Sequence, residues 1–140
     1  MAKDFKVFIS EEYSSRDIAV YNLIRNGTMF RLTGADEIKF DFCKNGSYTM
    51  QFLNRGNIFG TFLEIIPNRK VSLDWNVNGF GRDEEVGTKV IISIIKIDKG
   101  VIIEAIHSGI RNKISSNAKH KAWTEILKNM QQELVLLALI

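Results

Sequence analysis

One of the chain's two histidines stands beside residue types that acid–base catalysis uses. His107 comes three positions after Glu104 and directly before Ser108, near the end of a run of β-branched residues. A nucleophile, a base and an orienting acid act together only within hydrogen-bonding reach. In a strand, successive side chains alternate between the faces, so His107 would point away from Glu104 and Ser108. The pattern favours a His107 that hydrogen-bonds locally where strand meets turn. The alternatives are a polar contact to a ligand and a catalytic role.

The other side chains capable of chemistry have no complete set of partners in the sequence pattern. His120 and His107 offer two imidazoles, and no third zinc ligand accompanies them. Cys43, the only cysteine, is expected near a turn. It cannot form an internal disulfide, which indicates a reducing, cytoplasmic setting. The run Asp83-Glu84-Glu85 is expected in a solvated loop. We expect neither a metal nor a cofactor.

Glu64 interrupts the apolar segment TFLEII, so the face that it occupies matters. A buried carboxylate needs a partner or has a shifted pKa, and either outcome can mark a functional site. One interpretation places Glu64 in a cavity beside Phe62. The favoured interpretation places it in water, with Thr61, Leu63 and Ile65 facing the core.

The bulk composition is that of an ordinary globular protein. The 140 residues are 45% hydrophobic and 25% charged, which predicts one domain over residues 1–140. The net charge is +3, and because the basic residues are scattered, nucleic-acid binding is not expected. The longest apolar run, residues 134–140, is far shorter than the roughly 20 residues of a membrane span. The N-terminal segment MAKDFKVFIS does not resemble a signal peptide.

Period-two alternation of apolar residues predicts a chain rich in β-structure. The expected strands are 4–10, 37–42, 47–52, 57–66, 70–77, 88–97 and 101–108. After the first strand, residues 16–24 are expected to form a helix, and residues 28–37 a second short helix and a loop. Apolar residues recur every three or four positions over 120–140, which predicts a long last helix with Ser115 or Ser116 as its cap.

Strands and helices segregate along the chain instead of alternating, which predicts an α+β fold. An antiparallel sheet with one apolar face must cover that face. The last helix, roughly 30 Å long for about 20 residues, is the only element of sufficient length. We therefore expect a curved antiparallel sheet of about six to seven strands wrapped around a long C-terminal helix. One or two short helices should follow the first strand.

Eight side chains are expected to face a cavity between sheet and helix and to bind a lipophilic small molecule there. They are Phe40, Tyr48, Met50, Phe52, Phe62, Trp75, His107 and Trp123. Apolar pockets with a few polar groups are the usual form of small-ligand sites. Tyr48 and Trp75 would add a hydroxyl and an indole N–H. The alternative is that these side chains pack against one another and fill the core.

Four stretches resemble a known superfamily in their order and spacing. They are NGSYTMQF, GTFLEIIPNRKVSLDW, GTKVIISIIKIDKGVIIEAIHSGI and KHKAWTEILKNM. The chain resembles the START-like, helix-grip superfamily, also called SRPBCC or pollen-allergen-like. Within it, the chain is most like the family related to the activator of heat-shock protein 90 ATPase. The stretch NGTMFRLTGAD lacks the proline and tryptophan that members often carry after the first helix.

The resemblance implies a non-enzymatic binding module for a lipophilic small molecule. The alternative is a protein-interaction role of the co-chaperone or stress-response kind. Its partner would be a chaperone or, through the apolar tail LVLLALI, a second copy of the chain in a homodimer. A third hypothesis is a cavity-based enzyme, a cyclase or a hydrolase, because helix-grip folds include enzymes.

Overall fold

The computed structural model describes residues 4–80 and 85–139, which form a seven-stranded antiparallel sheet and three helices. The strands are β1 (Phe5–Tyr13), β2 (Glu37–Phe40), β3 (Ser47–Phe52), β4 (Gly56–Ile66), β5 (Lys70–Gly79), β6 (Glu85–Ile97) and β7 (Gly100–Ile110). The helices are α1 (Asp17–Arg25), α2 (Thr28–Arg31) and α3 (Lys113–Ala138). The expected number of strands, the two short early helices and the long last helix are confirmed.

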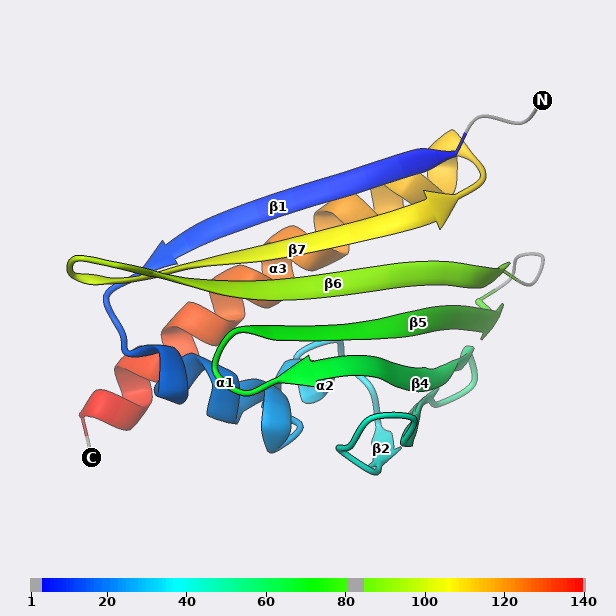
Figure 1. The fold of residues 1–140 in the computed structure, drawn as a ribbon. Helices are drawn as coiled ribbons and strands as arrows, with labels where there is room; N and C mark the ends of the chain where they lie inside the picture. The colour runs from blue at the N-terminus through cyan, green and yellow to red at the C-terminus, as the bar shows by residue number, and fades with distance from the viewer. Residues whose placement is uncertain (1–3, 81–84, 140) are drawn as a thin grey trace.

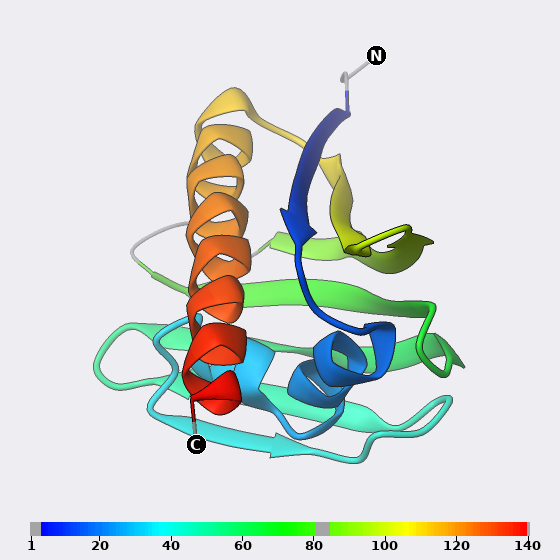
Figure 2. The ribbon, with the colours of Figure 1, turned by 90° about the vertical axis from the view of Figure 1, so that its left-hand side faces the viewer.

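The order of strands explains where the helices lie. The sheet runs β1-β7-β6-β5-β4-β3-β2, so β1 and β2 occupy opposite edges although they are neighbours in the chain. The chain crosses the sheet between them, and α1 and α2 lie along that crossing (Figure 1). Helix α3 lies across the same face, against β1 and β7 (Figure 2). This arrangement is the helix-grip fold, in which helices cover the apolar face of an antiparallel sheet.

The inner face of β7 shows the expected alternation. Val101, Ile103, Ala105 and His107 are each 0 or 1% exposed. Glu104 is half-buried on the opposite face, beside the edge strand β1 and the neighbouring strand β6. His107 therefore points toward the helices, away from Glu104, and the two side chains cannot act as an acid–base pair.

Phe30 of α2 packs on the part of the sheet formed by β2, β3 and β4. Its ring stacks on the ring of Tyr48 with a centroid distance of 5.4 Å and an interplanar angle of 5°. The rings of Phe40 and Phe62 lie at centroid distances of 5.8 and 6.2 Å from Phe30. Phe30, Tyr48 and Phe62 are all buried. The short helix thus fills space beneath these strands with an aromatic cluster.

Helix α3 begins at Lys113, seven residues before the predicted start at His120. The side chain of Asn112 accepts a hydrogen bond from the backbone N–H of Ser115 at 2.7 Å. Asparagine is among the strongest N-cap residues, because its side-chain oxygen satisfies one of the N–H groups that the first turn leaves free. The prediction that Ser115 or Ser116 caps the helix is therefore wrong, and the polar stretch before His120 is helical.

Several strand ends also differ from the prediction. Strand β6 begins at Glu85, and β7 continues through Gly109, which adopts a φ of +79°. Glycine tolerates this left-handed conformation, so the strand continues where a turn was expected. Strand β1 extends to Tyr13, and β2 ends at Phe40.

Glu64 points to water, as the favoured interpretation holds. The accompanying expectation that Thr61 and Leu63 face the core is wrong, because Phe62 is the fully buried residue, whereas Thr61 and Leu63 are half-buried and lie outside the core cluster that Ile65 contacts. The Glu64 side chain is exposed, and its carboxylate pairs with the ammonium of Lys70 at 2.8 Å, which lowers the pKa of Glu64. A bulge between Phe62 and Glu64 interrupts the strict alternation of β4. Because of the bulge, Phe62 faces the core although it is two positions from an outward-facing residue. In the described parts of the chain, none of the helices is both long enough and apolar enough to cross a membrane.

Candidate functional site

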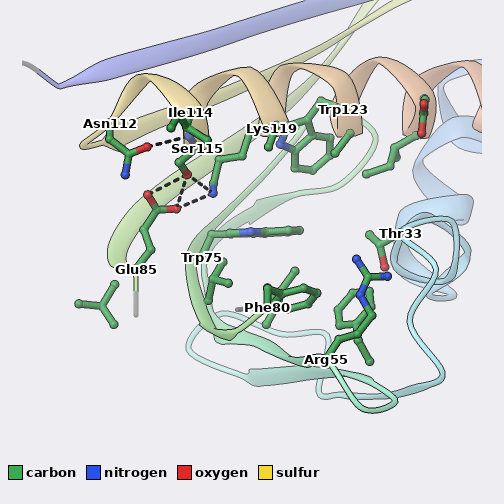
Figure 3. Close-up of a pocket in the computed structure, with 18 of the residues that line it drawn as sticks. Thr33, Arg55, Trp75, Phe80, Glu85, Asn112, Ile114, Ser115, Lys119 and Trp123 are labelled. Carbon is green, nitrogen blue, oxygen red and sulfur yellow. Dashed lines mark hydrogen bonds and ion pairs between the residues drawn. The ribbon is translucent and has the colours of Figure 1, made fainter. Parts of the chain in front are cut away.

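A pocket of about 1120 Å³ lies between α3 and the ends of the strands in the middle of the sheet (Figure 3). One face of α3 forms a wall, with Ser115, Ala118, Lys119 and Ala122 spaced three or four residues apart. The tip of the β3–β4 hairpin, the ends of β5 and β6 and the residues after α2 complete it. The volume slightly exceeds the typical range of about 300–1,000 Å³ for small-ligand pockets.

The lining is apolar in its middle and polar at its ends. Trp75, Phe80 and Trp123 face the interior of the pocket (Figure 3). Ile58, Val77 and Ile126 add aliphatic surface. Polar groups gather near the start of α3 and again around the hairpin tip. The pocket therefore offers aromatic faces to an apolar body and separate positions for polar groups.

A hydrogen-bond chain fixes the indole of Trp123. Its Nε1–H donates to Nδ1 of His107 at 3.1 Å. Nε2 of His107 lies 2.8 Å from Oγ1 of Thr88, and that hydroxyl donates to the backbone carbonyl of Trp75. Because Nδ1 is an acceptor, the proton of His107 must be on Nε2, which donates to Thr88. His107 thereby joins α3 to strands β5 and β6.

The same contacts keep His107 neutral. Burial, and then the positive charge of Lys119, lowers the pKa of His107 from 6.5 to about 3. If Nδ1 were also protonated, its N–H would face the indole N–H of Trp123, and two donors would oppose each other. His107 is fully buried and is not part of the pocket lining, and its hydrogen bond holds the wall residue Trp123 in place.

A polar cluster closes the end of the pocket near the start of α3. The Lys119 ammonium pairs with Glu85 at 2.5 Å and donates to Ser115 Oγ at 2.9 Å. Ser115 Oγ donates to the carboxylate oxygens of Glu85, which lie 3.0 and 3.1 Å away. The Lys119 and Glu85 side chains are each 14% exposed, so water screens the pair less than a surface ion pair. The cluster ties the start of β6 to α3 (Figure 3).

Arg55 and Phe80 form the opposite end of the pocket. The Arg55 guanidinium carbon lies 5.3 Å from the centroid of the Phe80 ring, which is a cation–π contact. The backbone N–H of Phe80 donates to the carbonyl of Arg55 at 2.6 Å. Gly79 has a φ of +97°, and a Cβ there would lie 2.6 Å from the same carbonyl. Only glycine allows this close approach of the hairpin tip to the end of β5.

The structure brings three of the eight predicted ligand-binding residues to the pocket. Phe52, Trp75 and Trp123 line it. The other five, Phe40, Tyr48, Met50, Phe62 and His107, do not belong to the lining. Phe40, Tyr48 and Phe62 lie in the aromatic cluster around Phe30, where the Tyr48 hydroxyl donates to the Asp74 carbonyl at 2.6 Å. Met50 and His107 are fully buried. Which of the eight contact a ligand remains a prediction.

Sequence reasoning missed the residues at the two ends of the pocket. Glu85 was expected in a solvated loop, but it lies in β6 and pairs with Lys119 on α3. Asp83 and Glu84 of the same run lie outside the described residues. Lys119 and Ser115 are four positions apart on one helix, a spacing visible in the sequence once the helix is known to begin at Lys113. No local signal places Arg55 beside Phe80.

In the described part of the chain, the remaining reactive side chains have no activating or metal-binding partners around them. Cys43 is exposed, and the pKa of its thiol is raised by desolvation and by the Asp41 carboxylate, so the thiol is not activated. Residues 4–80 and 85–139 contain no group of three His, Cys, Asp or Glu side chains placed to hold a metal ion.

Solved structures share the fold over nearly the whole chain. Protein MLL2253 from Mesorhizobium loti has a TM-score of 0.82 and 14% identity, over 94% of this chain and 96% of that chain. The Aha1 dimer from Colwellia psychrerythraea has a TM-score of 0.77 and 13% identity, over 93% and 96% of the two chains. CalU16 from Micromonospora echinospora has a TM-score of 0.67 and 13% identity, over 96% and 93%. At these identities the likeness establishes the class of fold, the helix-grip fold.

The family follows from the sequence itself. Residues 19–135 match the family model described as activator of Hsp90 ATPase homolog 1-like protein, and the chain belongs to that family. This confirms the resemblance noted in the sequence. No curated protein matches the chain significantly.

Proposed function

We propose that the protein is a non-enzymatic binding module that holds a lipophilic small molecule in the pocket between the sheet and α3. The observation that carries this proposal is the pocket of about 1120 Å³ with Trp75, Phe80 and Trp123 facing its interior. Aromatic and aliphatic walls with a few polar groups are what small lipophilic ligands occupy. Two large apolar side chains at the pocket, Val86 and Ile114, are 46% and 73% exposed. A bound apolar ligand would cover such surface.

The arrangement of polar groups favours binding over catalysis. Among the described lining residues, Ser115 carries the hydroxyl that most resembles a catalytic nucleophile. The proton of this hydroxyl points to the Glu85 carboxylate, whose charge is balanced by the ion pair with Lys119. The Lys119 ammonium donates to Ser115 and has no lone pair with which to accept the hydroxyl proton. His107, the one buried imidazole, is occupied at both nitrogens by Trp123 and Thr88. The cyclase or hydrolase hypothesis therefore ranks below binding.

The binding proposal is tested with a neutral fluorescent probe, N-phenyl-1-naphthylamine. We expect saturable binding with one site per chain. Ala118→Trp should abolish it, because residue 118 lines the pocket from α3 and the added indole fills the space. Asn117→Trp is the matched control, since residue 117 is exposed on the same helix but does not line the pocket. Absence of saturable binding, or equal binding by the two variants, would contradict the proposal.

A second candidate function is a protein-interaction role through the end of α3. Val135, Leu136, Leu137 and Leu139 are between 53% and 79% exposed. Clustered exposed apolar side chains of this size are typical of interaction sites. The Colwellia psychrerythraea Aha1 structure is a dimer, so we propose a second copy of this chain as the simplest partner and a chaperone as the alternative.

Light scattering tests the dimer. The full chain should have twice the mass of one chain, and a chain that ends at Leu134 should have the mass of one. A full chain with the mass of one chain would dismiss the dimer and leave a chaperone as the remaining partner to test, and two chains that are both dimers would dismiss the end of α3 as the interface. We also propose a cytoplasmic location, on the ground of the single exposed Cys43. Cell fractionation tests it.

A further inference from the structure

The charged side chains of the pocket are mostly basic. Among the described residues, the lining contains Arg55, Arg111, Lys113 and Lys119 against two acids, Glu85 and Glu125. An apolar pocket with an excess of positive charge complements a ligand that carries a negative group.

Two of the four ammonium and guanidinium groups have other contacts. Lys119 pairs with Glu85 at 2.5 Å, so the two charges neutralise each other. Lys113 Nζ lies 5.9 Å from the centroid of the Phe5 ring on β1, an edge strand that contributes nothing to the lining. Arg55 and Arg111 are both exposed, and Arg111 lies immediately before α3. Of these two, Arg55 is the one whose guanidinium lies against an aromatic ring of the pocket lining, that of Phe80.

Arg55 is held in position by backbone and side-chain contacts. Its carbonyl accepts from Phe80 N–H, and its guanidinium lies against the Phe80 ring. Phe80 adopts a φ of +63°, a left-handed conformation that is rare for a bulky residue. Such outliers occur where the surrounding structure enforces them, ligand clamps included. Figure 3 shows the guanidinium end of Arg55 directed into the pocket, on the side of Thr33.

We propose that Arg55 binds the carboxylate of an amphipathic ligand whose apolar body lies along Trp75, Phe80 and Trp123. The proposal rests on the proposed binding function and names its ligand class. A guanidinium presents paired N–H donors that match the two oxygens of a carboxylate. The aromatic contact with Phe80 limits its freedom, so little mobility is lost when the carboxylate binds.

The experiment compares two ligands that differ only in the head group. Dodecanoate below its micelle concentration and 1-dodecanol below its solubility limit compete with N-phenyl-1-naphthylamine for the pocket. We expect dodecanoate to displace the probe at about tenfold lower concentration than 1-dodecanol, because a charge-assisted hydrogen bond adds to the same apolar contact. Arg55→Gln should remove this preference, so that the two ligands displace the probe at similar concentrations.

Lys99→Gln is the matched control. It removes the same charge from an exposed position in the β6–β7 turn, outside the pocket lining. It should retain the full preference for dodecanoate. Equal displacement by the two ligands, or the same loss in both variants, overturns the role of Arg55 and leaves the binding function intact. A chain that binds neither the probe nor either ligand overturns both proposals.

Discussion

At the scale of the residue, His107 is built into the core in one protonation state. Its Nδ1 accepts from Trp123, and its Nε2 donates to Thr88, whose own hydroxyl donates to the Trp75 carbonyl. Every polar side-chain atom in this network therefore has a hydrogen-bond partner within the protein and needs no water. A buried network of this kind is stabilising when complete and costly when one member is removed.

Thr88→Val tests the network with almost no change of shape. The variant leaves the buried Nε2–H of His107 without an acceptor. We expect the free energy of unfolding to fall by about 1 to 3 kcal/mol, measured by urea denaturation. Thr124→Val is the control, because its hydroxyl bonds only to the His120 carbonyl of its own helix. The control should change stability by less than about 0.5 kcal/mol. Equal effects would show that the network contributes nothing.

The lowered pKa of His107 predicts how stability depends on pH. In the unfolded chain this imidazole has its ordinary pKa of 6.5, whereas in the folded chain its pKa is about 3. Between these values the unfolded state binds more protons, so stability falls as the pH falls. The loss should be about 1.4 kcal/mol per pH unit between roughly pH 6 and pH 4.

The pH slope is measured by urea denaturation at a series of pH values. His107→Asn should be less stable at neutral pH and should lose this part of the slope. His120→Asn removes an exposed histidine and serves as the control. If the wild-type chain and His107→Asn have the same slope, His107 is not held neutral by the fold.

At the scale of the element, the start of α3 determines which side chains reach the pocket. Ser115, Ala118 and Lys119 line the pocket from turns that precede the predicted helix start at His120. A helix beginning at His120 would leave these side chains on a loop, with no common face. The early start thus converts a polar stretch of sequence into one wall of the site.

Asn112→Ala tests the cap that sets this start. We expect a loss of about 1 kcal/mol in the free energy of unfolding, because the first turn loses the acceptor for the Ser115 N–H. Ser116→Ala is the matched control, since Ser116 is one of the two caps suggested by sequence and lies inside the helix. It should change stability by only a few tenths of a kcal/mol. A larger effect at Ser116 than at Asn112 would show that the helix begins later in solution.

At the scale of the whole molecule, the pocket exists only in the folded chain. Its walls come from residues between 32 and 126, carried by strands, a hairpin tip and α3. A ligand that binds there cannot bind the unfolded chain in the same way. Ligand binding and folding are therefore linked.

This linkage gives a prediction for the intact protein. Dodecanoate at 100 times its Kd should raise the free energy of unfolding by about 2.7 kcal/mol, measured by urea denaturation with and without ligand. The Ala118→Trp variant, with its pocket filled, should show no rise. A ligand that stabilises both chains equally would be binding elsewhere on the surface.

The sequence by itself determined the class of fold and the faces of its elements. Period-two and helical spacings depend on local backbone geometry, so they predicted the seven strands, the presence of the long helix and the inward side of His107, but not all of the element ends. The bulge in β4 was not visible in that alternation. The pattern nevertheless placed Glu64 outside the core.

Only the tertiary structure decided where the space between sheet and helix stays open. Phe30 of α2 fills the region beside Tyr48 and Phe62, so those rings became core, and the pocket lies toward Trp75 and Trp123. The pairs Glu85–Lys119 and Arg55–Phe80 join segments 34 and 25 positions apart in the chain. Such contacts depend on how whole elements dock, and neighbouring residues carry no periodic signal for them.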